Sequence, residues 1–168
     1  MIAVDTNVLV HLLTGDDRKQ AAMSGDLFAR EAIWIAKTVL LETGWVLRSL
    51  YGFEEGAIRD AFTKLLGLKN VEAEDERAVA AALAHTARGV EFADALHLSS
   101  RPPDAAFVSF DRSFVRLASR AGVCDISSVP EVVWARLHST VSAGELARAG
   151  TASAYGHCQR DLRKVLFP

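Results

Sequence analysis

Apolar residues along this chain recur with two different spacings. Short apolar runs of strand length occur at 2–4, 33–36, 70–72, 105–110 and 123–126. Between them, apolar positions follow the 3.6-residue period of a helix over 17–31, 38–50, 54–67, 75–88, 91–100 and 111–121. Strands that alternate with helices are typical of a parallel sheet covered on both faces. The pattern therefore predicts an α/β fold.

The spacing of turn residues predicts where the folded domain ends. Glycine and proline fall between the periodic segments, at Gly15, Gly52, Gly67, Gly89, Pro102-Pro103 and Gly122. With 168 residues, half of them apolar, one α/β domain is expected. From about residue 137 the chain becomes rich in small and polar residues. We expect one domain over 1–136 and a C-terminal extension of unknown role over 137–168.

Four acidic residues lie at the ends or starts of different apolar segments. Asp5 follows the first strand, Asp111 follows the strand at 105–110, and Asp94 lies in the first turn of helix 91–100. Ligands of parallel sheets bind outside the carboxyl ends of the strands, where Asp5 and Asp111 are expected. Each has a structural alternative: Asp5 and Asp111 as helix N-caps worth about 1 kcal/mol, and Asp94 as a complement to the helix dipole.

Glu42, the fourth acid, is expected inside an apolar arc of helix 38–50. A turn of about 100° per residue puts Val39, Trp45 and Val46 on the same side as Glu42. A buried carboxylate is costly unless a metal, a cation or a hydrogen-bond donor lies beside it. The alternative is a structural glutamate paired with an arginine or a backbone amide.

The four acids together predict a metal-dependent catalytic site. Carboxylates without thiol or imidazole ligands favour hard cations such as Mg²⁺ or Mn²⁺. Such ions activate a bound water and orient it for attack on a phosphodiester. Asp5, Asp94 and Asp111 are the expected direct ligands. Glu42 is expected to bind the metal or to hold the attacking water.

Net charge and cysteine content limit the kinds of partner and the cellular compartment that fit this chain. The net charge of −2 excludes general polycation behaviour, so nucleic-acid affinity must come from local cations. Arg112 and Arg116, on the helix after Asp111, predict phosphate contacts, or else a solvated face. Cys124 and Cys158 have no zinc-site spacing, and no apolar run is long enough to span a bilayer. A soluble protein of the reducing cytoplasm is expected.

The segments around the four acids resemble a known family. Asp5-Thr-Asn7, Leu-Glu42-Thr, Phe-Ala-Asp94-Ala-Leu-His and Ser-Phe-Asp111-Arg-Ser-Phe are similar to the PIN-domain ribonucleases, and most similar to VapC-type toxins of toxin–antitoxin pairs. The resemblance covers about residues 1–135. It implies a three-layer α/β/α fold with a mostly parallel central sheet, and RNA cleavage that depends on magnesium or manganese. It further implies a homodimer and a cognate antitoxin.

The same resemblance assigns roles to individual residues. It implies that Asp5, Glu42, Asp94 and Asp111 are the metal-binding acids, and that Asn7 and Ser109 make neighbouring polar contacts.

Two other functions agree with part of this pattern. A haloacid-dehalogenase-like phosphatase also opens with a strand that ends in Asp, but it needs a second Asp where this chain has Asn7. A non-catalytic binding module with the same fold is the second alternative, and the intact set of four acids argues against it.

Overall fold

The structure is a computed structural model, and it describes residues 1–129. The chain divides into two units, Met1–Ser127 and Ser128–Pro168. The extension predicted over 137–168 therefore lies outside the described residues, and the boundary predicted at 136 stays a prediction.

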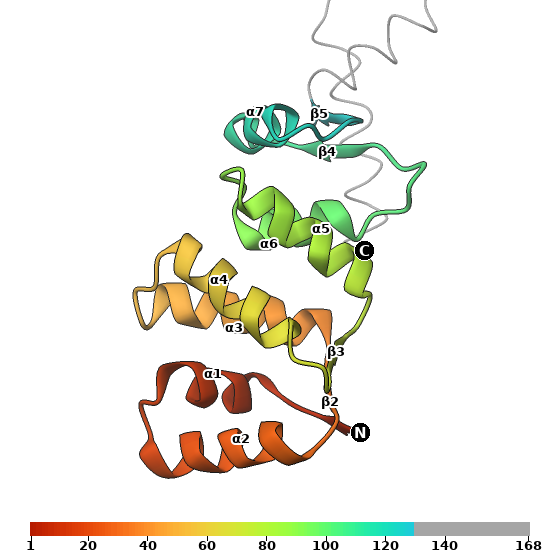
Figure 1. Ribbon diagram of the computed structural model, residues 1–168. Helices are drawn as coiled ribbons and strands as arrows, with labels where there is room; N and C mark the ends of the chain where they lie inside the picture. The colour runs from red at the N-terminus through yellow and green to blue at the C-terminus, as the bar shows by residue number, and fades with distance from the viewer. Residues whose placement is uncertain (130–168) are drawn as a thin grey trace, which may run out of the picture. The chain divides into compact units, whose positions relative to one another are not determined.

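Pairs of helices separate the first four strands of the described chain, and a single helix separates the last two (Figure 1). In order, the elements are β1 Ile2–Ala3, α1 Thr6–Thr14, α2 Arg18–Arg30, β2 Ile33–Ile35, α3 Lys37–Ser49, α4 Glu55–Leu66, β3 Val71–Ala73, α5 Glu76–Thr86, α6 Phe92–Ser99, β4 Phe107–Ser109, α7 Arg112–Arg120 and β5 Ile126–Ser128. Figure 1 shows α1 beside α2, α3 beside α4, and α5 beside α6, and each of these pairs is in contact.

The first three strands form a parallel sheet in the order β1-β2-β3. Ile2 pairs with Ile33, and Ile33 pairs with Val71, so β2 is the central strand. Strands β4 and β5 pair with each other in a second, two-stranded sheet. With its seven helices, the described chain has the α/β architecture that the sequence predicts, of the three-layer α/β/α class.

The core lies between the parallel sheet and the helices that pack on it. Ile33 and Ile35 of β2 are fully buried, as are Leu40 of α3 and Phe62 of α4. Burial of one such side chain contributes about 1.5–3 kcal/mol. The ring of Phe62 meets that of Phe92 edge to face, with centroids 5.0 Å apart. This contact joins the helix α6, which carries Asp94, to the core.

The element boundaries agree closely with the sequence pattern, with two exceptions. Helix α1 follows Asp5 directly but is missing from the six helical segments that periodicity predicts. The fifth strand was predicted at 123–126 and lies instead at Ile126–Ser128, so this prediction is wrong. The reason is local: Gly122 and Asp125 adopt left-handed backbone conformations, with φ of 82° and 57°, and these break an extended chain before Ile126.

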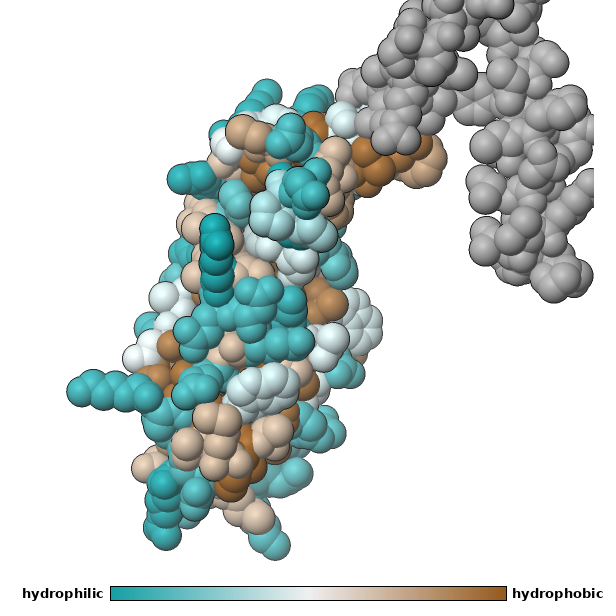
Figure 2. Space-filling view, turned by 90° about the vertical axis from the view of Figure 1, so that its right-hand side faces the viewer, coloured by the Kyte–Doolittle hydropathy of each residue, from teal (hydrophilic) through white to brown (hydrophobic). Residues whose placement is uncertain are grey.

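The surface is mainly hydrophilic on the face that Figure 2 shows, with small groups of hydrophobic side chains between the polar ones. Large exposed hydrophobic residues do occur on the molecule: Trp45 is 62% exposed, Leu50 71% and Phe110 79%. No helix within the described residues is long and apolar enough to cross a membrane.

Candidate functional site

Asp5 caps the helix that follows the first strand. Its backbone is extended, and its Oδ1 accepts a hydrogen bond from the Val8 amide at 3.1 Å. The structural alternative for Asp5 is thus observed. Capping uses only one carboxylate oxygen, and Asp5 is exposed, so Oδ2 remains open to a second partner.

Glu42 lies beside the start of the same helix. The hydroxyl of Thr6, the first residue of α1, donates to Glu42 Oε2 at 2.6 Å. The fold therefore brings a side chain of α3 next to the residue that follows Asp5. Of the partners considered for Glu42, namely a metal, a cation or a hydrogen-bond donor, the described residues contain a donor, the hydroxyl of Thr6.

The predicted burial of Glu42 is wrong, because α3 turns a different face to the core. Its buried residues are Leu40, Thr43, Gly44 and Leu47, whereas Glu42 is exposed and Trp45 is 62% exposed. The buried positions follow i, i+3, i+4, i+7 spacing, but two of them are small rather than apolar. Small residues allow close helix packing, which hydrophobicity alone does not reveal.

Asp94 is half-buried on α6 and has no hydrogen-bond or ion-pair partner among the described residues. Burial raises the pKa of its carboxyl, and the charges of Glu91 and Asp111 raise it further, against the opposing effect of His97. Asp94 and Asp111 are therefore close enough to interact electrostatically, although they lie on different elements.

Asp111 caps α7 just after the fourth strand. Its Oδ1 accepts hydrogen bonds from the amides of Ser113 and Phe114, at 2.8 and 3.0 Å. Ser109 accepts a hydrogen bond from the Asp111 amide through its Oγ, at 3.0 Å. Ser109 therefore holds the turn that places Asp111, a supporting contact consistent with its predicted role.

Three charged residues outside the predicted site hold the start of α6. Arg48 of α3 forms ion pairs with Glu91 and, at 3.6 Å, with Glu55. Glu55 Oε1 accepts a hydrogen bond from the Phe92 amide at 2.7 Å. The cap position of α6 is Glu91, which makes no side-chain capping bond. Because Glu91 is a poor N-cap residue, the sequence indicates that a residue from another element must satisfy the first amides of α6.

The four acids thus occur as two pairs. Glu42 lies against the first turn of α1 that Asp5 caps, and Asp94 lies within electrostatic reach of Asp111. Within residues 1–129 there is no group of three or more Asp, Glu, His or Cys side chains placed to hold a metal ion. The strands before Asp5 and Asp111 belong to separate sheets, so the sheet does not join the two pairs.

The predicted supporting residues are solvent-accessible. Asn7 is exposed on α1, and Arg112 and Arg116 are exposed on α7. Arg116 Nη2 lies 3.3 Å from Ser113 Oγ, in the first turn that Asp111 caps. Both guanidinium groups are exposed, so a phosphate near Asp111 could reach them, with Arg116 already hydrogen-bonded to Ser113.

The chemistry of the donors fits a hard divalent cation. All four side chains offer carboxylate oxygens, and capping leaves Oδ2 of both Asp5 and Asp111 without a hydrogen bond. Asp94 keeps both oxygens free and is disfavoured as an anion by its surroundings. A cation would offset the charge of such a group.

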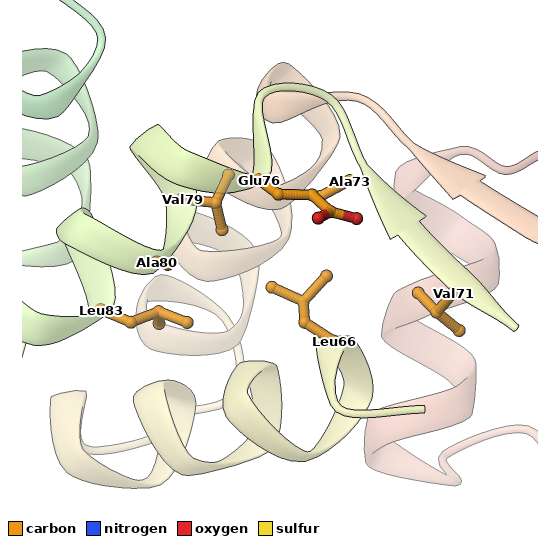
Figure 3. Close-up of a pocket in the computed structure, with 7 residues that line it drawn as sticks. All are labelled: Leu66, Val71, Ala73, Glu76, Val79, Ala80 and Leu83. Carbon is orange, nitrogen blue, oxygen red and sulfur yellow. The ribbon is translucent and has the colours of Figure 1, made fainter. Parts of the chain in front are cut away.

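A separate pocket of about 210 Å³ lies between α4, β3 and α5. Figure 3 shows Leu66, Val79 and Leu83 turned toward it, with the carboxylate of Glu76 beside Ala73. None of the four acids lines this pocket, and its walls are mainly apolar.

The family model of the PIN domain matches residues 2–120 of the chain, a range that contains all four acids. The protein therefore belongs to the PIN-domain family, a family of nucleases that act on RNA and are generally metal-dependent hydrolases. A comparison with curated proteins finds no match. Family membership favours the nuclease interpretation over the phosphatase alternative.

Proposed function

We propose that this protein is an endoribonuclease that requires Mg²⁺ or Mn²⁺, and that it is the VapC-like toxin of a toxin–antitoxin pair in the cytoplasm. One observation carries the metal requirement: Asp94 is a half-buried carboxylate without a partner, and two further carboxylates raise its pKa. Such a group is stabilised by a cation, and a cation also permits a polyanionic substrate to approach.

Asp5, Asp94 and Asp111 would hold the cation in this proposal, and binding would have to draw them together, because the described residues contain no group of three such side chains already placed for a metal ion. When bound, a divalent ion lowers the pKa of a water ligand and stabilises the leaving 3′ oxygen. Glu42 either joins the ligands or accepts a hydrogen bond from the attacking water. Its Oε2 is occupied by Thr6, which orients the carboxylate and leaves Oε1 for that role.

Arg112 and Arg116 would position the RNA. Both are exposed on α7, the helix whose N-terminus Asp111 caps. Guanidinium groups make bidentate contacts with phosphate oxygens and fix the register of the backbone. Asn7, exposed in the first turn of α1, would donate to substrate at the side of Asp5.

Purified protein with single-stranded and structured RNA tests whether cleavage requires Mg²⁺ or Mn²⁺. We expect no cleavage in EDTA and full recovery with excess Mg²⁺. The Asp94→Asn protein, purified in parallel, should lose at least a hundredfold in rate, which excludes a contaminating nuclease. Cleavage that continues unchanged in chelator would contradict the proposal, and a complete lack of cleavage with either cation would favour the non-catalytic binding module.

The toxin assignment rests on the sequence resemblance to VapC-type proteins and predicts a cognate antitoxin. A small protein encoded beside this one should lower the rate of RNA cleavage when it is added in equimolar amount. A neighbour that binds without changing the rate would contradict the inhibitory role.

A further inference from the structure

A second cavity, of about 460 Å³, lies apart from the four acids. It is bounded by α5, by the C-terminal end of α6 with the residues that follow it, and by the chain at 122–124. A volume of this size is in the range of cavities that bind small molecules.

Two arginines give the cavity a positive character. Arg77 and Arg101 both line it. Arg101 Nη2 donates to the carbonyl of Cys124 at 2.9 Å, which fixes its guanidinium at the wall. The one acid of the lining, Asp75, is 3.1 Å from Lys37 Nζ and also caps α5 through the Ala78 amide, so its charge is already offset.

Two polar atoms at the cavity wall have no hydrogen-bond partner in the described part of the chain. They are Nδ1 of His85 and Oγ of Ser99, and both are buried. Buried polar atoms without partners are rare in folded proteins and commonly mark a missing water, ion or ligand. Burial, with Arg88 and Arg101 nearby, lowers the pKa of His85. The imidazole ring of His85 is therefore neutral at neutral pH.

The remaining walls are apolar. Ala78, Ala81, Leu98, Pro103 and Val123 line the same cavity. A ligand that uses the whole site combines an anionic group with a flat or apolar organic part.

We infer that this cavity binds a nucleoside monophosphate, with the phosphate held by Arg77 and Arg101 at its wall. Arginine forks match the oxygens of a phosphate. The apolar walls meet the sugar and base. The site uses none of the four acids, so it does not depend on the proposed nuclease activity.

Calorimetric titration of the full chain in EDTA tests this inference with AMP, inorganic phosphate and adenosine as probes. We expect AMP to bind at least tenfold more tightly than phosphate or adenosine alone, because it alone occupies both parts of the cavity. Arg77→Gln should weaken AMP binding about tenfold or more, the usual size of a lost charged hydrogen bond. Arg30→Gln, an exposed arginine of α2 outside the cavity, is the matched control and should bind as the parent does.

A second measurement locates the ligand. Cys124 is exposed and lines the cavity. In a Cys158→Ser background, AMP should slow the modification of Cys124 by a thiol reagent, and Arg77→Gln should abolish this protection. No AMP binding at millimolar concentration, equal binding of AMP and phosphate, or AMP binding that neither depends on Arg77 nor protects Cys124 would each overturn the inference.

Discussion

At the residue scale, the carboxylate of Asp16, in the turn between α1 and α2, contacts both α1 and the residues that follow α3. Tyr51, after α3, donates its hydroxyl to Oδ2 at 2.6 Å. His11 Nδ1 and Thr14 Oγ1, both of α1, lie 2.7 and 2.9 Å from Oδ1. The hydrogen bond from Tyr51, followed by those from His11 and Thr14, holds the pKa of Asp16 well below its usual range. These contacts tie the α1–α2 turn to the end of α3.

This lowered pKa predicts a pH-dependent contribution to stability. A carboxyl whose pKa is lower in the folded state contributes stability above its unfolded pKa of about 4, and loses it as the pH falls further. We expect Asp16→Asn to lower the melting temperature at pH 6–7. The difference in melting temperature between the variant and the parent should decrease as the pH falls below about 4.

Thermal melts from pH 3 to pH 7 measure this gap. The control is Asp26→Asn, because Asp26 is an exposed residue of α2 for which the described residues provide no hydrogen-bond partner. A gap between Asp16→Asn and the parent that stays constant over this range would contradict the role assigned to the carboxylate.

At the scale of elements, the position of α6 depends on its contact with α3. Gly44 of α3 lies against the aromatic pair: a Cβ at this position would be 3.4 Å from Phe92 Cδ1 and 3.6 Å from Phe62 Cε2. These are ordinary contact distances, so one methyl group fits and a larger side chain does not. Gly44 thus sets how closely α6, and Asp94 with it, approaches the core.

Two substitutions at Gly44 should have opposite effects. Gly44→Ala should raise the free energy of unfolding by up to about 1 kcal/mol, because alanine favours the helix and meets no clash. Gly44→Leu should lower it by about 1–3 kcal/mol through overpacking, and should reduce RNA cleavage by displacing α6. Urea denaturation and the cleavage assay measure both effects.

Gly25 of α2 provides the control for helix propensity, since a Cβ there would meet nothing within 4 Å. Gly25→Leu should be stable and active. If Gly44→Leu behaves like Gly25→Leu, the contact with Phe62 and Phe92 does not constrain α6.

The elements themselves could be predicted from the sequence, whereas the faces they bury could not. Apolar periodicity gave six helices to within about two residues, because helix position is a local property. Glu42 was expected in an apolar, buried arc together with Trp45, but the buried face of α3 includes Thr43 and Gly44 instead. Likewise, the missing cap at Glu91 indicates an outside partner for the helix of Asp94, but no local pattern identifies Arg48 and Glu55 as that partner, because those contacts join residues far apart in the chain.

The sequence predicts which residues belong to the candidate site better than it predicts how they are arranged in space. The positions of Asp5 and Asp111 after strands could be predicted, and both follow strands in the structure. Their use as helix caps was recognised as an alternative, and it is observed alongside free oxygens. The electrostatic effect of Asp111 on Asp94 depends on where α6 and α7 lie in the fold, which no local pattern encodes.

At the scale of the whole molecule, exposed apolar side chains on α3 agree with the predicted homodimer. Trp45 is 62% exposed, and Leu41, one turn earlier, is only half-buried. Large exposed aromatic residues commonly mark an interface. We expect light scattering at micromolar concentration to give the mass of a dimer, and Trp45→Arg to shift it toward the monomer.

Met23 of α2 is the matched control, because it is 63% exposed. Met23→Arg should remain dimeric. A parent protein with a strictly monomeric mass would contradict the dimer, and equal dissociation of the two variants would contradict the assignment to α3.

The melting behaviour of Asp94→Asn tests most directly whether the acids form a metal site or are unrelated helix-terminus residues. Carboxylates that repel one another without metal are relieved when one is neutralised. In EDTA the variant should melt at the same temperature as the parent or higher, and added Mg²⁺ should stabilise it less than the parent. Asp104→Asn, an exposed loop residue, should respond to Mg²⁺ as the parent does. An Asp94→Asn protein that is less stable in EDTA, is stabilised by Mg²⁺ as much as the parent and still cleaves RNA would contradict the metal site.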